Sequence, residues 1–273
     1  MNSPKNAKPP AVPDVLAGRR QLGPQDEFCF ACHSMLECFT RCCHDVNILL
    51  TPVDVLRLAR RIGLSTTDFL DQHTSLPITK DLHLPVVALR MAETPEKPCP
   101  FLGKGAAGCT VYADRPWACR MYPIGMALPP ARAGVDPKPL YFLFEDSYCK
   151  GGGEPARWTV DAWRADQEIA SREELEQGFQ EIVSHPWFIG GRQLDPPRMQ
   201  MFHTACFDLD SFRRFVFQST FLRRFALEPE LVEELRVDDA ALLRFGFRWL
   251  RYALFGEPTL KLHDSAAGSG RNP

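Results

Sequence analysis

Apolar and polar positions repeat with a helical period over much of the chain, and the clearest helix has both of its ends marked. In residues 51–63, TPVDVLRLARRIG, apolar side chains recur every three or four positions and can share one face. Thr51 and Asp54 form a capping-box-like pair at the start. Pro52 suits the first helical position, and Gly63 is a stop signal. The pattern predicts a helix between Thr51 and Gly63.

The next segment, STTDFLDQH, repeats the cap pattern with Ser65 and Asp68. From Thr159 onward the pattern is again helical, and two segments there carry long apolar stripes. These are DLDSFRRFVFQSTFLRRF, with Phe212, Phe215, Val216 and Phe221 or Leu222, and DDAALLRFGFRWLRYALFG, with Leu242, Phe245, Trp249 and Tyr252. We expect the arginine pairs between these apolar positions to form a solvated face.

Composition along the chain predicts four parts. Residues 1–27 are rich in proline, glycine and polar side chains and are expected to form a flexible leader. Residues 28–155 contain nine of the ten cysteines. The stretch GGGEPARWT reads as a linker into a helical domain at 156–262, and residues 263–273 form a polar tail that we expect to be disordered.

Overall composition excludes several classes of protein. The chain has 273 residues, a formal net charge of -2 and 45% hydrophobic residues, which gives no sign of a nucleic-acid or membrane-surface partner. No apolar run approaches the roughly 18 residues that a membrane span needs. The N-terminal residues lack the apolar segment of a signal peptide, so the sequence predicts a cytoplasmic protein.

A cytoplasmic location changes the interpretation of the cysteines. In a reducing compartment, cysteines indicate metal binding or redox chemistry more than disulfide bonds. A disulfide scaffold remains the alternative if the protein is exported. The stretch CFACH also matches the C-x-x-C-H motif of c-type haem attachment, which would likewise require export.

The cysteines fall into groups separated by long intervals. The groups are Cys29, Cys32, Cys38, Cys42 and Cys43; then Cys99, Cys109 and Cys119; then Cys149; and finally Cys206. Zinc sites and Fe–S clusters both commonly use four thiolates for each centre. Nine clustered cysteines exceed the needs of one such site.

The adjacent pair Cys42–Cys43 bears on the number of centres. Neighbouring side chains point in different directions on a helix or a strand. A disulfide between them would need a strained small ring, and they cannot easily converge on one tetrahedral ion. They can serve two nearby centres. The pair therefore favours two centres, or one multinuclear centre, over a single ion.

Other polar residues near the cysteines have two interpretations each. His44 and His33 could be alternative ligands or proton donors, or ordinary turn histidines that hydrogen-bond the backbone. Arg115 and Arg120 could offset the negative charge of a thiolate centre, or could form surface ion pairs. We expect Trp117 and the Tyr122–Pro123 pair to cover the site. Cys206 is expected to be a buried small hydrophobic residue, and Cys29 a spare thiol.

Long stretches of the first half resemble a known family. FACHSMLECFTRCCHDVNILLTPVDVLRLARRIGLSTTDFL, CPFL…GCTVYADRPWACRMYP and CKGGG are similar to the CxxCxxCC zinc- or iron-chelating family, also called the YkgJ-like cysteine-cluster family. The resemblance covers about residues 28–160. The first cysteine group departs from the family's name-giving spacing, because it reads C-x5-C-x3-C-C.

The resemblance implies metal binding and a set of eight ligands. The matching positions are Cys32, Cys38, Cys42, Cys43, Cys99, Cys109, Cys119 and Cys149, which leaves Cys29 and Cys206 outside. Related flagellin lysine N-methylases share a cysteine cluster of this kind, which raises the prospect of an Fe–S centre with S-adenosylmethionine chemistry. The chain contains no recognisable nucleotide-binding glycine motif to support this.

We therefore predict a mainly α protein with a loop-rich, metal-stabilised cysteine-cluster region and few short strands. The predicted function is binding one or two metal centres, as Fe–S clusters slightly more than as Zn(II). The alternatives are an Fe–S enzyme with redox or methyl-transfer activity, a metal chaperone or store, and a structural zinc protein whose helical domain binds a protein partner.

Overall fold

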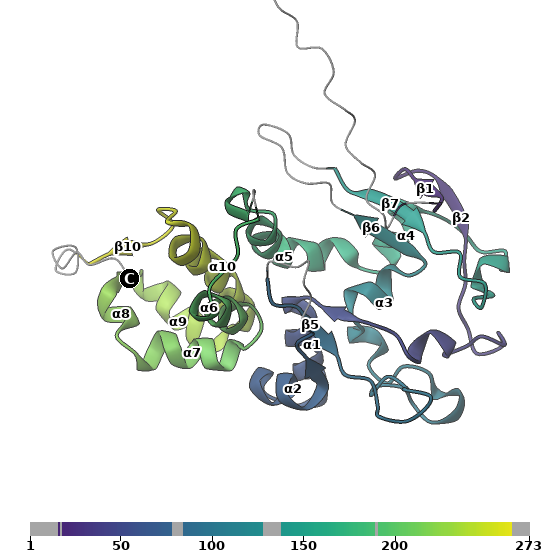
Figure 1. The fold of residues 1–273 in the computed structure, drawn as a ribbon, viewed down its shortest axis with the longest axis horizontal. Helices are drawn as coiled ribbons and strands as arrows, with labels where there is room; N and C mark the ends of the chain where they lie inside the picture. Colours follow the sequence, from purple (N-terminus) through teal and green to yellow (C-terminus); the bar gives the residue numbers. More distant parts are fainter. Residues whose placement is uncertain (1–15, 17, 78–83, 128–137, 189–190, 264–273) are drawn as a thin grey trace, which may run out of the picture.

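The computed structural model describes most of the chain, namely residues 16, 18–77, 84–127, 138–188 and 191–263. Within these residues the protein is mainly α-helical, with ten α-helices and ten short strands that form four small sheets (Figure 1). The predicted fold class is confirmed. Most of the predicted leader and nearly all of the predicted tail lie outside the described residues.

Helix α1, Pro52–Ile62, has the predicted ends. The Thr51 hydroxyl accepts a hydrogen bond from the Asp54 N–H at 3.1 Å, and the Asp54 carboxylate accepts one from the Thr51 N–H at 3.1 Å. Gly63 ends the helix with a left-handed φ of 73°, a conformation that glycine adopts without steric cost. Both capping predictions are confirmed.

Helix α2, Thr66–His73, begins after Ser65, whose hydroxyl accepts from the Asp68 N–H at 3.0 Å. A three-stranded antiparallel sheet accompanies α1 and α2. Its strands, in the order β3-β5-β4, are Leu49–Leu50, Val87–Leu89 and Thr74–Ser75.

Two further sheets lie at the other end of the cysteine-rich part. One has the order β1-β7-β6, with strands Gln21–Leu22, Leu140–Leu143 and Ile124–Ala127. In the other, β2, Glu27–Cys29, pairs antiparallel with β8, Arg157–Thr159. The predicted linker is thus wrong for residues 157–159. The reason is tertiary, because the Trp158 indole N–H donates to the Phe30 carbonyl at 3.0 Å and Trp158 packs against the smaller core.

The middle of the chain forms three helices: α3, Trp117–Met121; α4, Val160–Asp166; and α5, Ile169–Val183. Figure 1 shows α5 between the C-terminal helices and strands β6 and β7. Helix α5 contacts α1, α3, α4 and α10. It therefore connects the cysteine-rich part to the C-terminal helices.

The C-terminal part is helical, as predicted. Its helices are α6, Pro196–Cys206; α7, Leu209–Gln218; α8, Phe221–Arg224; α9, Pro229–Val237; and α10, Asp239–Phe255. The apolar stripe of residues 208–225 is divided between α7 and α8, because Ser219 and Thr220 interrupt the helix and the Ser219 hydroxyl accepts from the Phe221 N–H. A two-stranded sheet of β9, Phe225–Ala226, and β10, Lys261–Leu262, closes this part.

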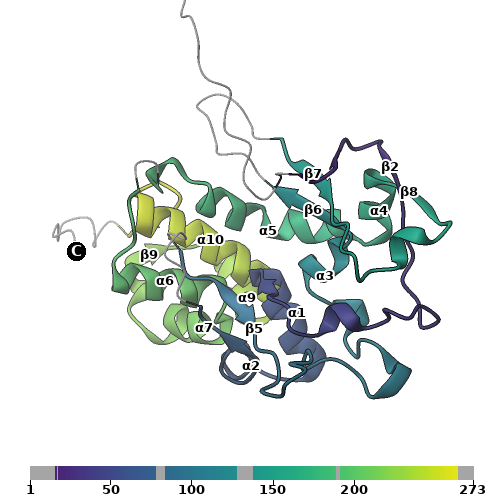
Figure 2. The ribbon, with the colours of Figure 1, turned by 45° about the vertical axis from the view of Figure 1, so that its right-hand side comes forward.

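Two hydrophobic cores hold these elements together. The larger core unites side chains of α1, α2 and β5 with side chains of α6, α7 and α10, and α2 lies against α7 (Figure 2). Leu58, Phe69, Phe202, Phe212 and Leu242 are each 0% exposed in it. Burying one such side chain contributes about 1.5–3 kcal/mol. The core therefore spans the predicted boundary at residue 155, and that domain division stays a prediction.

The smaller core lies beneath β1, β2 and β6, and its members include Phe28, Phe30, Met121, Ile124 and Trp163. None of the helices in the described ranges is long and apolar enough to cross a membrane.

Candidate metal centre

Cys42 and Cys43 lie in a tight turn. The turn is the 3₁₀ helix η2, Arg41–Cys43, which Thr40 precedes with a left-handed φ of 66°. The Cys43 N–H donates to the Thr40 carbonyl at 2.8 Å. A 3₁₀ helix has three residues per turn, so adjacent side chains are about 120° apart. The two sulfurs nevertheless lie within hydrogen-bonding distance of each other.

Backbone hydrogen bonds place the second cysteine-bearing segment beside the first. The Cys99 N–H donates to the Cys43 carbonyl at 2.7 Å. After Cys99 the chain makes a tight loop and returns at Cys109, which forms an isolated antiparallel bridge with Leu102. Cys43, Cys99 and Cys109 are therefore held close to one another by the main chain.

Glycines make this loop possible. The Gly103 N–H donates to the Gly108 carbonyl at 2.7 Å. A β-carbon at Gly103 would lie 2.8 Å from the Ala107 β-carbon, which is too close, and Gly108 has a φ of 66°. The CPFLGKGAAGC sequence thus has glycine at positions where another residue would strain the loop, including Gly105 with its φ of 61°.

The last two candidate ligands come from different elements. Cys119 lies in α3, and Cys149 lies in the loop after β7, where its N–H donates to the Asp146 carbonyl at 2.9 Å. The next residue, Lys150, donates its backbone N–H to the Cys38 sulfur at 3.2 Å. Such backbone donors favour the thiolate form of a cysteine.

The charges that raise the pKa values of the thiols favour dividing eight of the cysteines into two sets of four. We call Cys32, Cys38, Cys42 and Cys149 the first thiol group. Burial, together with the charges of Cys42, Cys38 and Cys149, raises the pKa of Cys32 to about 11. The charges of those three thiols therefore act on the pKa of Cys32.

The remaining four, Cys43, Cys99, Cys109 and Cys119, are the second thiol group. The Cys119 thiol is accessible to solvent, but crowding by protein atoms raises its pKa to about 12, with added contributions from the charges of Cys99, Asp54 and Cys109. The Phe101 and Val111 N–H groups donate to the sulfurs of Cys99 and Cys109 and partly offset the rise in pKa that burial causes. Each of these sulfurs thus accepts from the residue two positions further on.

Cys42 lies between the two groups. The Cys43 thiol donates a hydrogen bond to the Cys42 sulfur, which lowers the pKa of Cys42 to about 7 and raises that of Cys43. The charge of Cys42 also acts on Cys32 in the first group and on Cys99 and Cys119 in the second. The adjacent pair thus lies where the two groups meet, with one member in each.

The thiols are gathered but do not form a closed site. Among the residues that the structure describes, no three His, Cys, Asp or Glu side chains have the geometry to hold a metal ion. All ten cysteines are free thiols. Chemically the donor set suits zinc or Fe–S clusters, because each set has four soft sulfur ligands. Closing either set around a metal would require side-chain adjustment.

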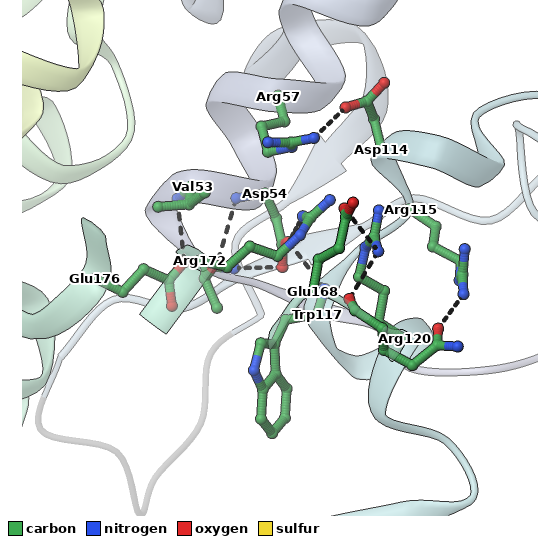
Figure 3. Close-up of polar contacts among 12 residues, drawn as sticks. Val53, Asp54, Arg57, Asp114, Arg115, Trp117, Arg120, Glu168, Arg172 and Glu176 are labelled. Carbon is green, nitrogen blue, oxygen red and sulfur yellow. Dashed lines mark hydrogen bonds and ion pairs between the residues drawn. The ribbon is translucent and has the colours of Figure 1, made fainter. Parts of the chain in front are cut away.

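Charged groups from α1 and α5 hold the segment 112–117, which connects Cys109 to Cys119 (Figure 3). The Arg120 and Arg172 guanidinium groups both donate to the Ala113 carbonyl. Arg57 donates to the Asp114 carboxylate at 2.8 Å. The backbone leading to Cys119 is therefore fixed from two sides.

Asp54 completes this arrangement at the start of α3. Its carboxylate accepts from the Trp117 N–H at 2.9 Å, besides capping α1. Arg172 lies 3.8 Å from the same carboxylate, and Glu176 accepts from the Val53 N–H at 3.3 Å. Asp54, Arg172 and Glu176 are at most 3% exposed. One buried carboxylate thus joins α1, α3 and α5.

Burial dominates the ionisation of this network. It raises the pKa of Asp54 to about 6 and that of Glu176 to about 8, and it lowers the pKa of Arg172 to about 10. For both Asp54 and Arg172, burial therefore shifts the pKa more than the attraction between the two charges does. A buried ion pair of this kind gives little net gain in stability. Its role is better explained as positioning α1, α3 and α5 relative to one another.

The structure also shows the surroundings of the two histidines, of Arg120 and of Cys206. His44 donates from Nδ1 to the Thr40 carbonyl at 3.2 Å, which is the turn-histidine interpretation, and His33 lies 3.2 Å from Glu154. Arg120 is 4% exposed, donates to the Gln167 carbonyl at 2.8 Å and lies 3.7 Å from the exposed Glu168 carboxylate, so it forms an ion pair from a buried position. Cys206 is 0% exposed, which confirms its predicted burial.

The positive charge of the Arg115 guanidinium acts on the pKa of thiols in both groups. Its charge lowers the pKa of both Cys32 and Cys109, against the rise caused by burial. It also donates to the Gln167 side chain and lies over the Tyr112 ring. Arg115 therefore acts on both thiol groups.

Sequence reasoning missed the buried roles of Asp54, Arg172 and Glu176. The capping role of Asp54 was visible, but a capping aspartate is normally exposed. The sequence held no clear signal for this burial, because α1 is amphipathic and carries Arg57, Arg60 and Arg61 on its polar side. An amphipathic helix has an exposed face, so its pattern does not predict that its first turn lies inside the protein.

A comparison with protein families finds a match. Residues 31–150 match the model of the CxxCxxCC family, described provisionally as a zinc- or iron-chelating domain. This segment of the chain is similar to that family. The matched range begins just before Cys32 and ends just after Cys149, so it contains both thiol groups. No curated protein and no solved structure matches the chain.

Proposed function

We propose that the chain binds two adjacent four-thiolate metal centres. The first would use Cys32, Cys38, Cys42 and Cys149, and the second Cys43, Cys99, Cys109 and Cys119. Fe–S clusters are favoured slightly over Zn(II). One observation supports the proposal: the charges that raise the thiol pKa values associate Cys32 with Cys38, Cys42 and Cys149, and Cys119 with Cys99 and Cys109.

The surroundings of the thiols are suited to negatively charged centres. Four thiolates around Zn(II), or around an oxidised cubane cluster, carry a net charge of about −2. The Arg115 guanidinium lowers the pKa of thiols in both groups. The backbone N–H groups of Phe101, Val111 and Lys150 donate to sulfur atoms. A bound zinc ion would close the loops, and a bound cluster would in addition accept and release one electron.

The metal can be identified directly. The full chain purified without oxygen should contain iron and acid-labile sulfide in equal amounts and should absorb visible light. Two cubane clusters would give about eight iron atoms per chain. Colourless protein that contains zinc without sulfide would overturn the Fe–S assignment and leave the two-centre proposal with zinc.

Two serine substitutions test the number of centres. Cys42→Ser and Cys43→Ser should each lose about half of the metal, and the double variant nearly all of it, because each thiol belongs to a different centre. Cys29→Ser is the matched control from the same segment and should retain the full complement. If either single substitution loses all of the metal, a single cooperative site replaces the two-centre proposal.

An enzymatic function is the second candidate, and one observation favours it. Cys149 of the first thiol group lines a surface cavity, so a bound molecule could approach that centre. An Fe–S enzyme with redox or methyl-transfer activity would need such access. S-adenosylmethionine titrated into the reduced protein would perturb its electron-paramagnetic-resonance signal if the first centre performs this chemistry, and would leave it unchanged if the centres are structural.

A further inference from the structure

The cavity beside the first thiol group has the size of a small-molecule site. Its volume is about 770 Å³, and ligand pockets commonly measure roughly 300–1,000 Å³. Strand β2, the end of β7 and the loop that follows β7 surround it. The lining side chains that the argument uses are Arg20, Glu27, Glu145, Asp146, Lys150 and Arg157.

The cavity and the first thiol group share a wall. Cys149 lines the cavity directly. The Asp146 carboxylate, also in the lining, accepts from the Tyr122 hydroxyl at 3.2 Å, and that hydroxyl contacts Cys149 as well. The Lys150 backbone donates to Cys38. A molecule in the cavity would therefore lie next to residues that position two thiols of the group.

Charges of both signs surround the cavity in equal number. Arg20, Arg157 and Lys150 are cationic, and Glu27, Glu145 and Asp146 are anionic. The Arg157 guanidinium lies 3.3 Å from the Glu27 carboxylate. Glu145 and Lys150 make no side-chain ion pair or hydrogen bond within the described residues. They remain able to contact a ligand.

This balance selects the ligand class. A polyanion such as a nucleoside triphosphate would meet three carboxylates, and a bare cation would meet three basic groups. A zwitterion can satisfy both. Phe28, Phe30 and Phe144 also line the cavity, and Phe28 and Phe30 are at most 5% exposed, so they form a rigid apolar floor.

We infer that the cavity binds a small zwitterion with an apolar body, of amino-acid or dipeptide size, beside the first metal centre. The unpaired Glu145 faces its ammonium group, the unpaired Lys150 its carboxylate, and the aromatic floor its apolar body. The inference rests on the proposed function only where it places this ligand next to a metal.

The probe is the dipeptide glycyl-L-phenylalanine, which carries both charges and an aromatic side chain. Two analogues each lack one charge: the N-acetyl dipeptide has no ammonium group, and the dipeptide amide has no carboxylate. Calorimetric titration into the full chain, purified without oxygen, should show that the dipeptide binds about tenfold more tightly than either analogue. Equal affinities for the three compounds, or no binding of any of them, would overturn the inference.

Substitutions assign the charges. Glu145→Gln should weaken the dipeptide and its amide by about fivefold to tenfold and leave the N-acetyl compound unchanged. Lys150→Gln should weaken the dipeptide and the N-acetyl compound and leave the amide unchanged. Glu233→Gln and Arg248→Gln, outside the cavity, are the matched controls. Uniform weakening of all three compounds would indicate a structural effect and would contradict the charge assignment.

Metal content measured in the same samples separates the two proposals. If the metal is present and the dipeptide does not bind, the zwitterion site is wrong and the metal proposal stands. If the chain binds no metal and the dipeptide binds with the expected charge dependence, the cavity is a zwitterion site without a metal neighbour. Dipeptide binding that changes the visible absorption of the metal-loaded protein supports both.

Discussion

The two thiol groups have similar ligands but different supports. Three of the second group's cysteines are fixed by the main chain, since Cys99 donates to Cys43 and the Cys99–Cys109 loop is closed by glycines. Its fourth, Cys119, lies on a helix that the buried Asp54 caps. In the first group, Cys32 and Cys38 lie in a loop whose long-range support is the Ala31 N–H bond to the Gly151 carbonyl and the Lys150 N–H bond to the Cys38 sulfur, and Cys149 lines an open cavity.

This difference in support indicates that the two centres have different roles. A structural centre needs rigid ligands and closed surroundings, whereas an exchangeable or reactive centre needs access. The second group has buried charged supports from α1 and α5, and Cys99 and Cys109 pack against the larger core. The first group has a cavity at its edge. We expect the second centre to stabilise the fold and the first to react or exchange.

The largest expected effect is the response to a chelator. In the Cys43→Ser variant only the first centre remains, and in Cys42→Ser only the second. The first centre should release its metal at least about tenfold faster, because its ligands lie in loops, and its loss should leave most of the structure intact. Loss of the second should lower the stability more than loss of the first, while the larger core keeps the chain folded.

Release rates followed by a metal indicator, with circular dichroism recorded in parallel, measure both quantities. Equal release rates from the two variants would contradict the division between an inert and an exchangeable centre. The larger core contains residues from both sides of residue 155, so the same traces also show whether helicity survives the loss of the second centre.

Some features of the two thiol groups and their supports could be predicted from the sequence, and others could not. The ends of α1 and α10 were predictable, because capping and stop residues act within one or two turns. The presence of a sulfur-rich metal site was predictable from cysteine number and spacing. These signals are local, and each depends on a few neighbouring residues.

The grouping of the thiols depends on tertiary contacts. Cys38 meets the Lys150 backbone across 112 positions, and Asp54 meets Trp117 across 63. The spacing of residues along the sequence does not show which of them come into contact in the folded protein. Strand β8 was missed for the same reason, because its partner β2 is far away in sequence.

The next largest effect is expected at Asp54. Asp54→Asn removes the charge opposite Arg172 and places an N–H donor near the Trp117 N–H, so it should destabilise the protein by about 3–5 kcal/mol. In the Cys42→Ser background it should also alter the absorption spectrum of the second centre, because α3 carries Cys119. In the Cys43→Ser background the first centre's spectrum should not change.

Asp68→Asn is the matched control, because Asp68 lies at the same position in the first turn of α2 but is exposed. It should cost about 0.5–2 kcal/mol and change neither spectrum. An Asp54 variant that loses stability without any spectral change would show that the buried carboxylate supports the fold and not the centre.

The smallest effect concerns pH and the neighbour of Asp54. Burial raises the pKa of Glu176 to about 8, from an ordinary value of 4.5. Between these values the unfolded chain loses a proton that the folded protein keeps, so stability falls as pH rises, by at most about 1.4 kcal/mol per pH unit. Asp54, with a pKa of about 6, acts in the same direction at lower pH. Glu176 is therefore best tested from pH 6.5 to 8.

Glu176→Gln keeps an oxygen acceptor for the Val53 N–H but cannot ionise. Urea unfolding of the metal-loaded protein should show that the variant loses less stability than the unmodified chain between pH 6.5 and 8. Contributions from thiols and histidines are common to both proteins and cancel in the difference. Glu233→Gln, whose side chain is 74% exposed, should follow the unmodified chain. Parallel pH profiles for Glu176→Gln and the unmodified chain would mean that Glu176 is ionised in the fold, and that the support of the second thiol group is more polar than its burial implies.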